Sequence, residues 1–105
     1  MLLKNIFVHH VHFWLNDTAD LPKLLEGLHS LEKISHVKQI HVGIKADTHR
    51  DVVDRSYDAS LLIIFDDQPA HDAYQVDPLH DEFVANYVKP YVSKVVVRDC
   101  VDSPL

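Results

Sequence analysis

Two strand-like segments of this chain carry apolar side chains on both of their faces. In segment 4–15, the residues of one face are Ile6, Val8, His10, His12 and Trp14, and those of the other are Phe7, His9, Val11, Phe13 and Leu15. Segment 57–65 ends in five consecutive apolar residues, 61–65. Successive side chains of a strand point to opposite faces, so these strands need cover on both sides of a sheet.

Two segments with helical spacing separate the strands. In the first, leucines recur every three or four residues, at positions 21, 24, 25, 28 and 31. Pro22 suits the first helical turn, and this spacing predicts a helix that ends near Ser35. The second helix begins after Asp67. It is interrupted and restarted at Asp77 and Pro78, which suit an N-cap and the first helical position, and we expect it to end at Pro90.

The remaining segments complete an alternating order of strands and helices. Residues 37–44 and 57–65 are predicted strands, joined by the polar loop 45–56, whose role is left open. Residues 95–97 begin a last strand, and residues 99–105 are expected to be a tail. The order predicts a β-α-β-β-α-β chain of the α+β class, a single domain over residues 1–105 with both helices on one face of the sheet.

The helices of such a fold leave the second apolar face of the sheet without cover. The tail is too short to hide it, and a bare apolar patch of this width usually marks an interface. The simplest cover is the same face of a second copy related by a two-fold axis. We therefore expect a homodimer.

Composition restricts the class of partner. The formal charge of −6 disfavours nucleic acid, whose phosphates require a basic surface. We expect no membrane span or signal peptide, and the single cysteine fits a reducing, cytoplasmic location. Protonating all nine histidines would move the formal charge from −6 to +3, so charge should respond strongly to pH between about 5 and 7.

Several stretches resemble the stress-responsive A/B barrel (Dabb) family. They are residues 8–13 (VHHVHF), 57–58 (YD), 65–67 (FDD), 74–83 (YQVDPLHDEF) and 88–90 (VKP). The likeness covers residues 4–99. It implies a ferredoxin-like fold with an antiparallel sheet, and a dimer whose two sheets face each other as a barrel. Activity in this family varies: one group, olivetolic acid cyclase, closes a polyketide chain, and the related antibiotic-biosynthesis monooxygenases need no cofactor.

The resemblance also implies a candidate catalytic set of His10, Tyr74 and His80 in a pocket between sheet and helices. A neutral imidazole can remove an acidic proton beside a carbonyl, and a phenol can hydrogen-bond the oxygen that gains charge. No metal or other cofactor is expected. Two positions depart from the cyclase pattern: Asp77 stands where the motif has its first histidine, and Ala59 where the cyclase has another pocket histidine.

Five further residues are candidates for the pocket wall, namely His12, Trp14, Ala59, Leu61 and Phe83. An alternative is that His10 and His80 only hydrogen-bond within the core, with Tyr74 as a core aromatic. A second alternative is a metal site, because His10 and His12 share one strand face and His80 could complete a set.

Three functions therefore stay open. The first is a homodimer that binds a small, partly apolar ligand between sheet and helices. The second is a cofactor-independent lyase, cyclase or isomerase for β-keto or polyketide-like substrates. The third is a stress-related structural protein without a small-molecule site.

Overall fold

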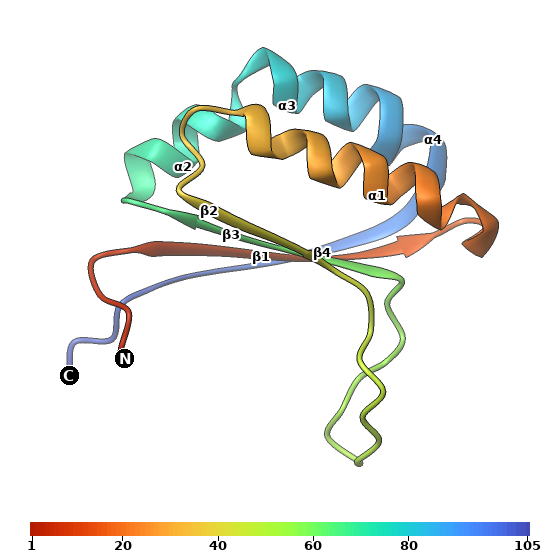
Figure 1. Cartoon of the computed structure of the whole chain (residues 1–105), viewed down its shortest axis with the longest axis horizontal. Helices are drawn as coiled ribbons and strands as arrows, with labels where there is room; N and C mark the ends of the chain where they lie inside the picture. Colours follow the sequence, from red (N-terminus) through yellow and green to blue (C-terminus); the bar gives the residue numbers. More distant parts are fainter.

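The computed structural model describes all 105 residues and shows one sheet with every helix on the same side (Figure 1). The strands are β1 (Phe7–Leu15), β2 (Gln39–Gly43), β3 (Ala59–Phe65) and β4 (Val92–Val101). They lie in the order β2-β3-β1-β4, and each neighbouring pair is antiparallel. The predicted α+β, ferredoxin-like β-α-β-β-α-β fold is confirmed.

The first helical segment comprises η1 (Thr18–Asp20), α1 (Leu21–Ser30) and η2 (Leu31–Lys33). The second comprises α2 (Gln68–Gln75), α3 (Pro78–Phe83), the π-helical turn η3 (Val84–Val88) and α4 (Lys89–Tyr91). Side-chain caps set the starts of α2 and α3: Asp67 accepts from the Ala70 N–H at 2.9 Å and Asp77 from the Leu79 N–H at 2.8 Å. None of these helices is long and apolar enough to cross a lipid bilayer.

The main core lies between the helices and one face of the sheet. On β1, burial alternates strictly, with Phe7, His9, Val11, Phe13 and Leu15 buried. The leucine stripe of the first helix meets this face, and Leu24, Leu28 and Leu31 are fully buried. The other strands and the second helical segment add Ala59, Leu61, Ile63, Phe65, Tyr74 and Phe83.

The opposite face, called here the helix-free face, is covered by no element of the chain (Figure 1). Its residues follow from the cross-strand register. They are Val8, His10, His12 and Trp14 on β1, Gln39, His41 and Gly43 on β2, Ser60, Leu62 and Ile64 on β3, and Lys94, Val96, Arg98 and Cys100 on β4. The loop between β2 and β3 projects beyond this face, away from the helices (Figure 1).

Three predicted boundaries need correction. Residues 99–101 belong to β4 because Val101 pairs with Phe7 of β1, so the expected tail begins only after them. The first strand starts at Phe7, since Asn5 takes a left-handed φ of 58° and turns the chain. The second helical segment ends at Tyr91 of α4, one residue beyond the expected end at Pro90, and α4 directly follows the π-helical turn.

Candidate functional site

A cavity of about 220 Å³ lies on the helix side of the sheet, between β1 and β4 below and the second helical segment above. It exists because the helices cover β4 less completely than β1 and β3: Val95 and Val97, which face the helices, are 42% and 49% exposed. Its wall is formed by His9, Val11, Phe13, Gln75, His80, Phe83, Val84, Val88, Val95 and Val97. An apolar wall with two imidazoles suits a small ligand that carries one polar group.

His9 is the buried histidine of this cavity, only 4% exposed. Its Nδ1 lies 2.6 Å from Asp99 Oδ1, on the paired residue of β4. Burial lowers the pKa of His9, and the nearby Asp99 carboxylate opposes that effect only in part. A neutral His9 whose Nδ1–H donates to Asp99 keeps an unprotonated Nε2 that can accept a hydrogen bond from a ligand.

Tyr74 and His80 lie side by side, with ring centroids 4.9 Å apart, and the Tyr74 ring is 5.9 Å from that of His9. Burial raises the pKa of Tyr74 well above its usual range, so its hydroxyl stays protonated. Burial also lowers the pKa of His80, against the raising effect of Asp81 and Asp77. The cavity therefore presents a neutral imidazole that can accept a proton.

Of the expected set His10, Tyr74 and His80, only His80 lies in the cavity wall: Tyr74 is a fully buried core aromatic beside it, and the expectation is wrong for His10. Adjacent residues on a strand point to opposite faces, and His10 lies on the helix-free face with its ring 4.5 Å from that of His12. The histidine beside Tyr74 is His9. The alternation of β1 was the signal that could have found it, because His9 shares a face with Val11 and Phe13.

The five other candidates divide between the two faces. Phe83 lines the helix-side cavity, whereas Ala59 and Leu61 point to the same side but are fully buried core residues. His12 and Trp14 line a different hollow, on the helix-free face. The alternative metal set of His10, His12 and His80 does not gather, because His80 lies on the other side of the sheet.

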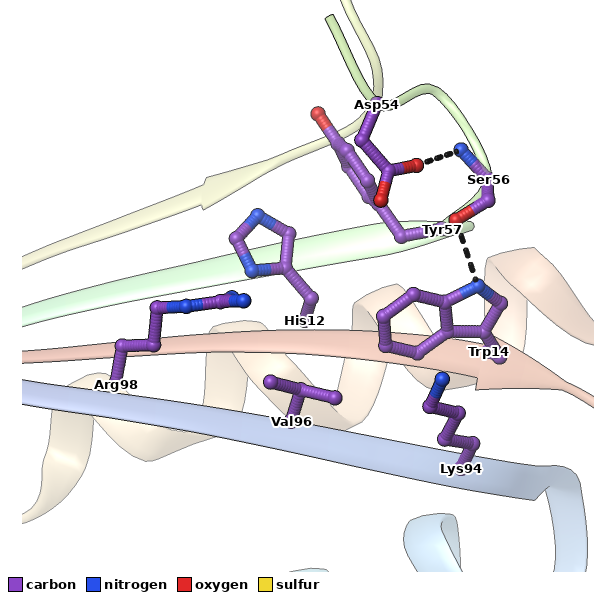
Figure 2. Close-up of a pocket in the computed structure, with 8 residues that line it drawn as sticks. All are labelled: His12, Trp14, Asp54, Ser56, Tyr57, Lys94, Val96 and Arg98. Carbon is purple, nitrogen blue, oxygen red and sulfur yellow. Dashed lines mark hydrogen bonds between the residues drawn. The ribbon is translucent and has the colours of Figure 1, made fainter. Parts of the chain in front are cut away.

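Figure 2 shows this second hollow, of about 270 Å³, where the β2–β3 loop meets the helix-free face. Trp14 Nε1 donates to Ser56 Oγ at 3.3 Å, and Lys94 Nζ lies 4.6 Å from the Trp14 ring centroid. Burial lowers the pKa of His12, and the nearby His10 and Arg98 lower it further. Arg98 lies directly beside His12 (Figure 2). Asp54, Tyr57 and Val96 complete the lining, which is polar and rich in cations.

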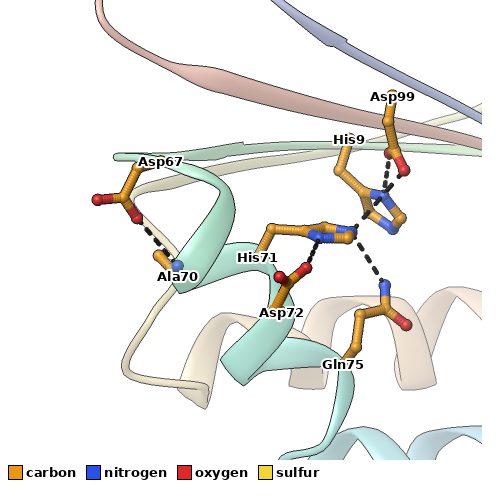
Figure 3. A network of polar contacts seen from close by, with 7 residues as sticks. All are labelled: His9, Asp67, Ala70, His71, Asp72, Gln75 and Asp99. Carbon is orange, nitrogen blue, oxygen red and sulfur yellow. Dashed lines mark hydrogen bonds and ion pairs between the residues drawn. The ribbon is translucent and has the colours of Figure 1, made fainter.

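A third arrangement is a polar cluster next to the helix-side cavity (Figure 3). His9, His71 and Asp99 each place a possible metal-ligand atom within 4.8 Å of the others. They come from β1, α2 and β4, so the fold and not a local sequence motif brings them together. This is why residue spacing gave no sign of the cluster.

Comparison with known proteins gives a clear fold assignment. The profile described as Stress responsive A/B Barrel Domain matches residues 7–102. A Dabb family protein with a ferredoxin-like fold from Mesorhizobium loti is 24% identical, with a TM-score of 0.77, over 93% of this chain and 97% of that one. A dimeric ferredoxin-like protein of unknown function from Jannaschia is 19% identical (TM-score 0.77, 92% and 99% covered).

A similar structure with a stated activity is a hydroxynitrile lyase from Passiflora edulis. It is 17% identical, with a TM-score of 0.76, and the match covers 98% of each chain. Comparison with curated protein sequences finds no match. Identities this low establish a shared fold and carry no chemistry with them.

Proposed function

Since this chain belongs to the stress-responsive A/B barrel family, we propose that it works as a homodimer that binds a small, partly apolar ligand in the helix-side cavity. The observation that carries the ligand proposal is the pairing of two imidazoles, the buried His9 and the partly buried His80, with an otherwise mainly valine and phenylalanine wall. Such a site would hold an apolar body against the valines and orient one carbonyl or hydroxyl toward the imidazoles.

The homodimer is supported by the helix-free face. Leu62 of β3 is only half-buried at its centre, beside Val8 and His10 of β1, which are half-buried too, and no helix lies on this side of the sheet (Figure 1). Similar structures from Jannaschia, Bacteroides fragilis and Thermobifida fusca are described as dimeric. A second copy placed face to face would bury this surface and enclose the hollow beside Trp14.

A second candidate is a cofactor-independent lyase, cyclase or isomerase acting on a β-keto or polyketide-like substrate. It is favoured by the neutral imidazole of His80 beside the protonated phenol of Tyr74. His80 would remove the acidic proton and His9 would hold the carbonyl oxygen, while Tyr74, buried behind the His80 ring, would keep that imidazole in place. A hydroxynitrile lyase is among the proteins with this fold.

Ligand binding can be tested by filling the cavity. Acetophenone, 2-acetylcyclohexanone and ethyl acetoacetate each combine an apolar part with a carbonyl, and their binding is measured by ligand-observed NMR. At least one should bind wild type with a dissociation constant in the millimolar range or better. Val88→Trp, which fills the cavity, should abolish binding, whereas Val76→Trp, at an exposed site on α2's end, should not.

Binding that survives Val88→Trp, or no binding of any probe, would contradict the proposal and favour a stress-related structural protein without a small-molecule site.

Catalysis is tested separately, through the exchange of the α-protons of ethyl acetoacetate for deuterium. The second candidate predicts an exchange rate above that of buffer, lost in His80→Ala and kept in His29→Ala, a change at an exposed histidine of α1. Equal rates in wild type and His80→Ala would remove His80 from the role of base.

A further inference from the structure

We propose that His9, His71 and Asp99 form a binding site for one divalent transition-metal ion of the zinc class. The site goes beyond the proposed ligand cavity and does not depend on any organic ligand. Two imidazoles and one carboxylate are a donor set that suits zinc and its first-row neighbours, and three protein ligands leave coordination positions open.

The three donor atoms lie near one another, and a bound ion would replace the proton that His9 Nδ1 donates to Asp99 in the metal-free chain. Asp99 stands between the two histidines: its Oδ1 lies 2.6 Å from His9 Nδ1, and its Oδ2 lies 3.9 Å from His71 Nε2. All three donor atoms lie within 4.8 Å of one another. Ligands of a tetrahedral zinc ion are about 3.4 Å apart, so side-chain adjustments on the order of 1 Å would complete the coordination.

His71 is held in the tautomer that a metal ligand needs. Its Nδ1 lies 3.0 Å from Asp72 Oδ1, so the Nδ1–H donates to this carboxylate and Nε2 keeps a lone pair. The Gln75 amide nitrogen, 3.4 Å from Nε2, can only donate and agrees with this assignment. A carboxylate behind a metal-binding histidine is the usual outer-shell arrangement, because it fixes the ring and raises its basicity.

That arrangement leaves two acceptors facing each other. Nε2 of His71 lies 3.9 Å from Asp99 Oδ2, and its one donor is the Gln75 amide nitrogen at 3.4 Å (Figure 3). Asp72 and Asp99 also place two negative charges around two imidazoles. A divalent cation between His71 and Asp99 would remove both the lone-pair repulsion and the excess charge.

The cluster is sheltered and mechanically fixed. The side chains of His9 and His71 are 6% and 12% exposed, and that of Asp99 is 37% exposed, which leaves a path for an ion from solvent. The His71 ring stacks on Phe7 with centroids 4.5 Å apart, and the three ligands lie on three different elements. Because rigid elements hold the ligands near one another, little conformational entropy is lost when an ion binds.

His9 also belongs to the wall of the helix-side cavity, so the ion would lie at one end of it. There it would act as a Lewis acid toward a carbonyl or hydroxyl of a bound molecule.

The test uses the full chain, freed of metal with EDTA and titrated with Zn²⁺ by calorimetry and with Co²⁺ by visible absorption. Wild type should bind one ion per chain, and Co²⁺ should give the ligand-field bands of nitrogen and oxygen coordination. Asp99→Asn, which keeps the side-chain shape, should weaken binding by at least about 100-fold, and Asp72→Asn by about 10- to 100-fold.

The matched control is Asp47→Asn. Asp47 also lies 2.6 Å from a histidine, His49, but both are exposed and no second imidazole joins them, so this change should leave binding as in wild type. His71→Asn gives an independent reading if Asp99→Asn does not fold. Three results would each overturn the proposal. They are no saturable binding to wild type, binding by Asp99→Asn and His71→Asn as tight as that of wild type, and loss of binding in Asp47→Asn.

Discussion

His9 and His10 are adjacent on β1, yet they occupy very different environments on the two faces of the sheet. His9 is almost fully buried against Tyr74 and held by Asp99. His10 lies on the helix-free face beside His12, and its cross-strand partner there is Arg98. His9 is thus a candidate ligand contact on the helix side, whereas His10 is a candidate interface residue on the helix-free face.

This contrast shows that the face of the sheet decides the role of a residue more than its chemical type does. The helix side combines a closed core with a cavity that carries two imidazoles. The helix-free side is broad, half-buried and unpartnered, with cationic groups on β4. We assign ligand binding to the helix side and self-association to the helix-free side.

Two adjacent leucines on β3 offer the strongest test of the difference. Leu61 is fully buried under the helices, whereas Leu62 is only half-buried on the helix-free face. Leu61→Ala should lower the free energy of unfolding by about 2–5 kcal/mol, because it opens a void in a closed core. Leu62→Ala should lower the free energy of unfolding by less. Because Leu62 lies in the proposed dimer interface, this loss should grow with protein concentration. Urea unfolding at two concentrations measures both; equal losses at every concentration would remove the distinction between the faces.

A charge at the centre of the helix-free face should separate the two copies. Leu62→Glu would place a carboxylate opposite its own copy across the proposed two-fold interface. We expect the dimer dissociation constant to rise by about 100-fold, or roughly 2.7 kcal/mol. Analytical ultracentrifugation measures this, with Val76→Glu, an exposed site on the helix side, as the control that stays dimeric. A wild-type chain that sediments as a monomer at micromolar concentration would refute the interface itself.

Two histidine–aspartate pairs have the same nitrogen–oxygen distance, but one is sheltered by the core and the other is exposed. His9–Asp99 and His49–Asp47 both have a nitrogen–oxygen distance of 2.6 Å, but only the first is largely buried. Asp99→Asn should destabilise the metal-free chain by about 1.5–3 kcal/mol, the range for a hydrogen bond to a charged group. Asp47→Asn should cost less than about 0.5 kcal/mol. Thermal unfolding in EDTA measures both, and similar values would mean that burial adds nothing to the first pair.

The smallest expected effect is on pH dependence. Burial lowers the pKa of His12 on the helix-free face and of His80 in the cavity below the ordinary 6.5. The unfolded chain then binds more protons than the folded one, so stability is complete above about pH 6.5 and falls as the pH drops through the folded pKa values. NMR titration should also show a His12 pKa that falls further as the dimer forms and a His80 pKa that does not change. A His12 that titrates at 6.5 or above in the dimer would contradict this.

The sequence predicted most of the fold, because its signals are local. The leucine spacing of α1, the Asp77 cap with Pro78, and the alternating faces of β1 all act within a few residues. The site was harder to predict. The alternation of β1 places His9 on the helix side, whereas the family resemblance points to its neighbour His10 on the other face.

The metal-ligating cluster could not be predicted from spacing. His9, His71 and Asp99 meet only because β4 returns beside β1 and α2 crosses above both. The extent of β4 was also underestimated at both ends: the polar residues Ser93, Lys94, Arg98 and Asp99 weaken the strand pattern, and pairing with β1 decides where the strand begins and ends.

One experiment tests directly whether a ligand binds on the helix side of the sheet and not on the helix-free face. Methyl-labelled chain is titrated with whichever of the three carbonyl probes binds tightest, and the chemical shifts of its valine methyl groups are followed. The account predicts shifts at Val11, Val84, Val88 and Val97 around the helix-side cavity and none at Val8 or Val96 on the helix-free face. Shifts confined to Val8 and Val96 would place the ligand at the other face and contradict the account.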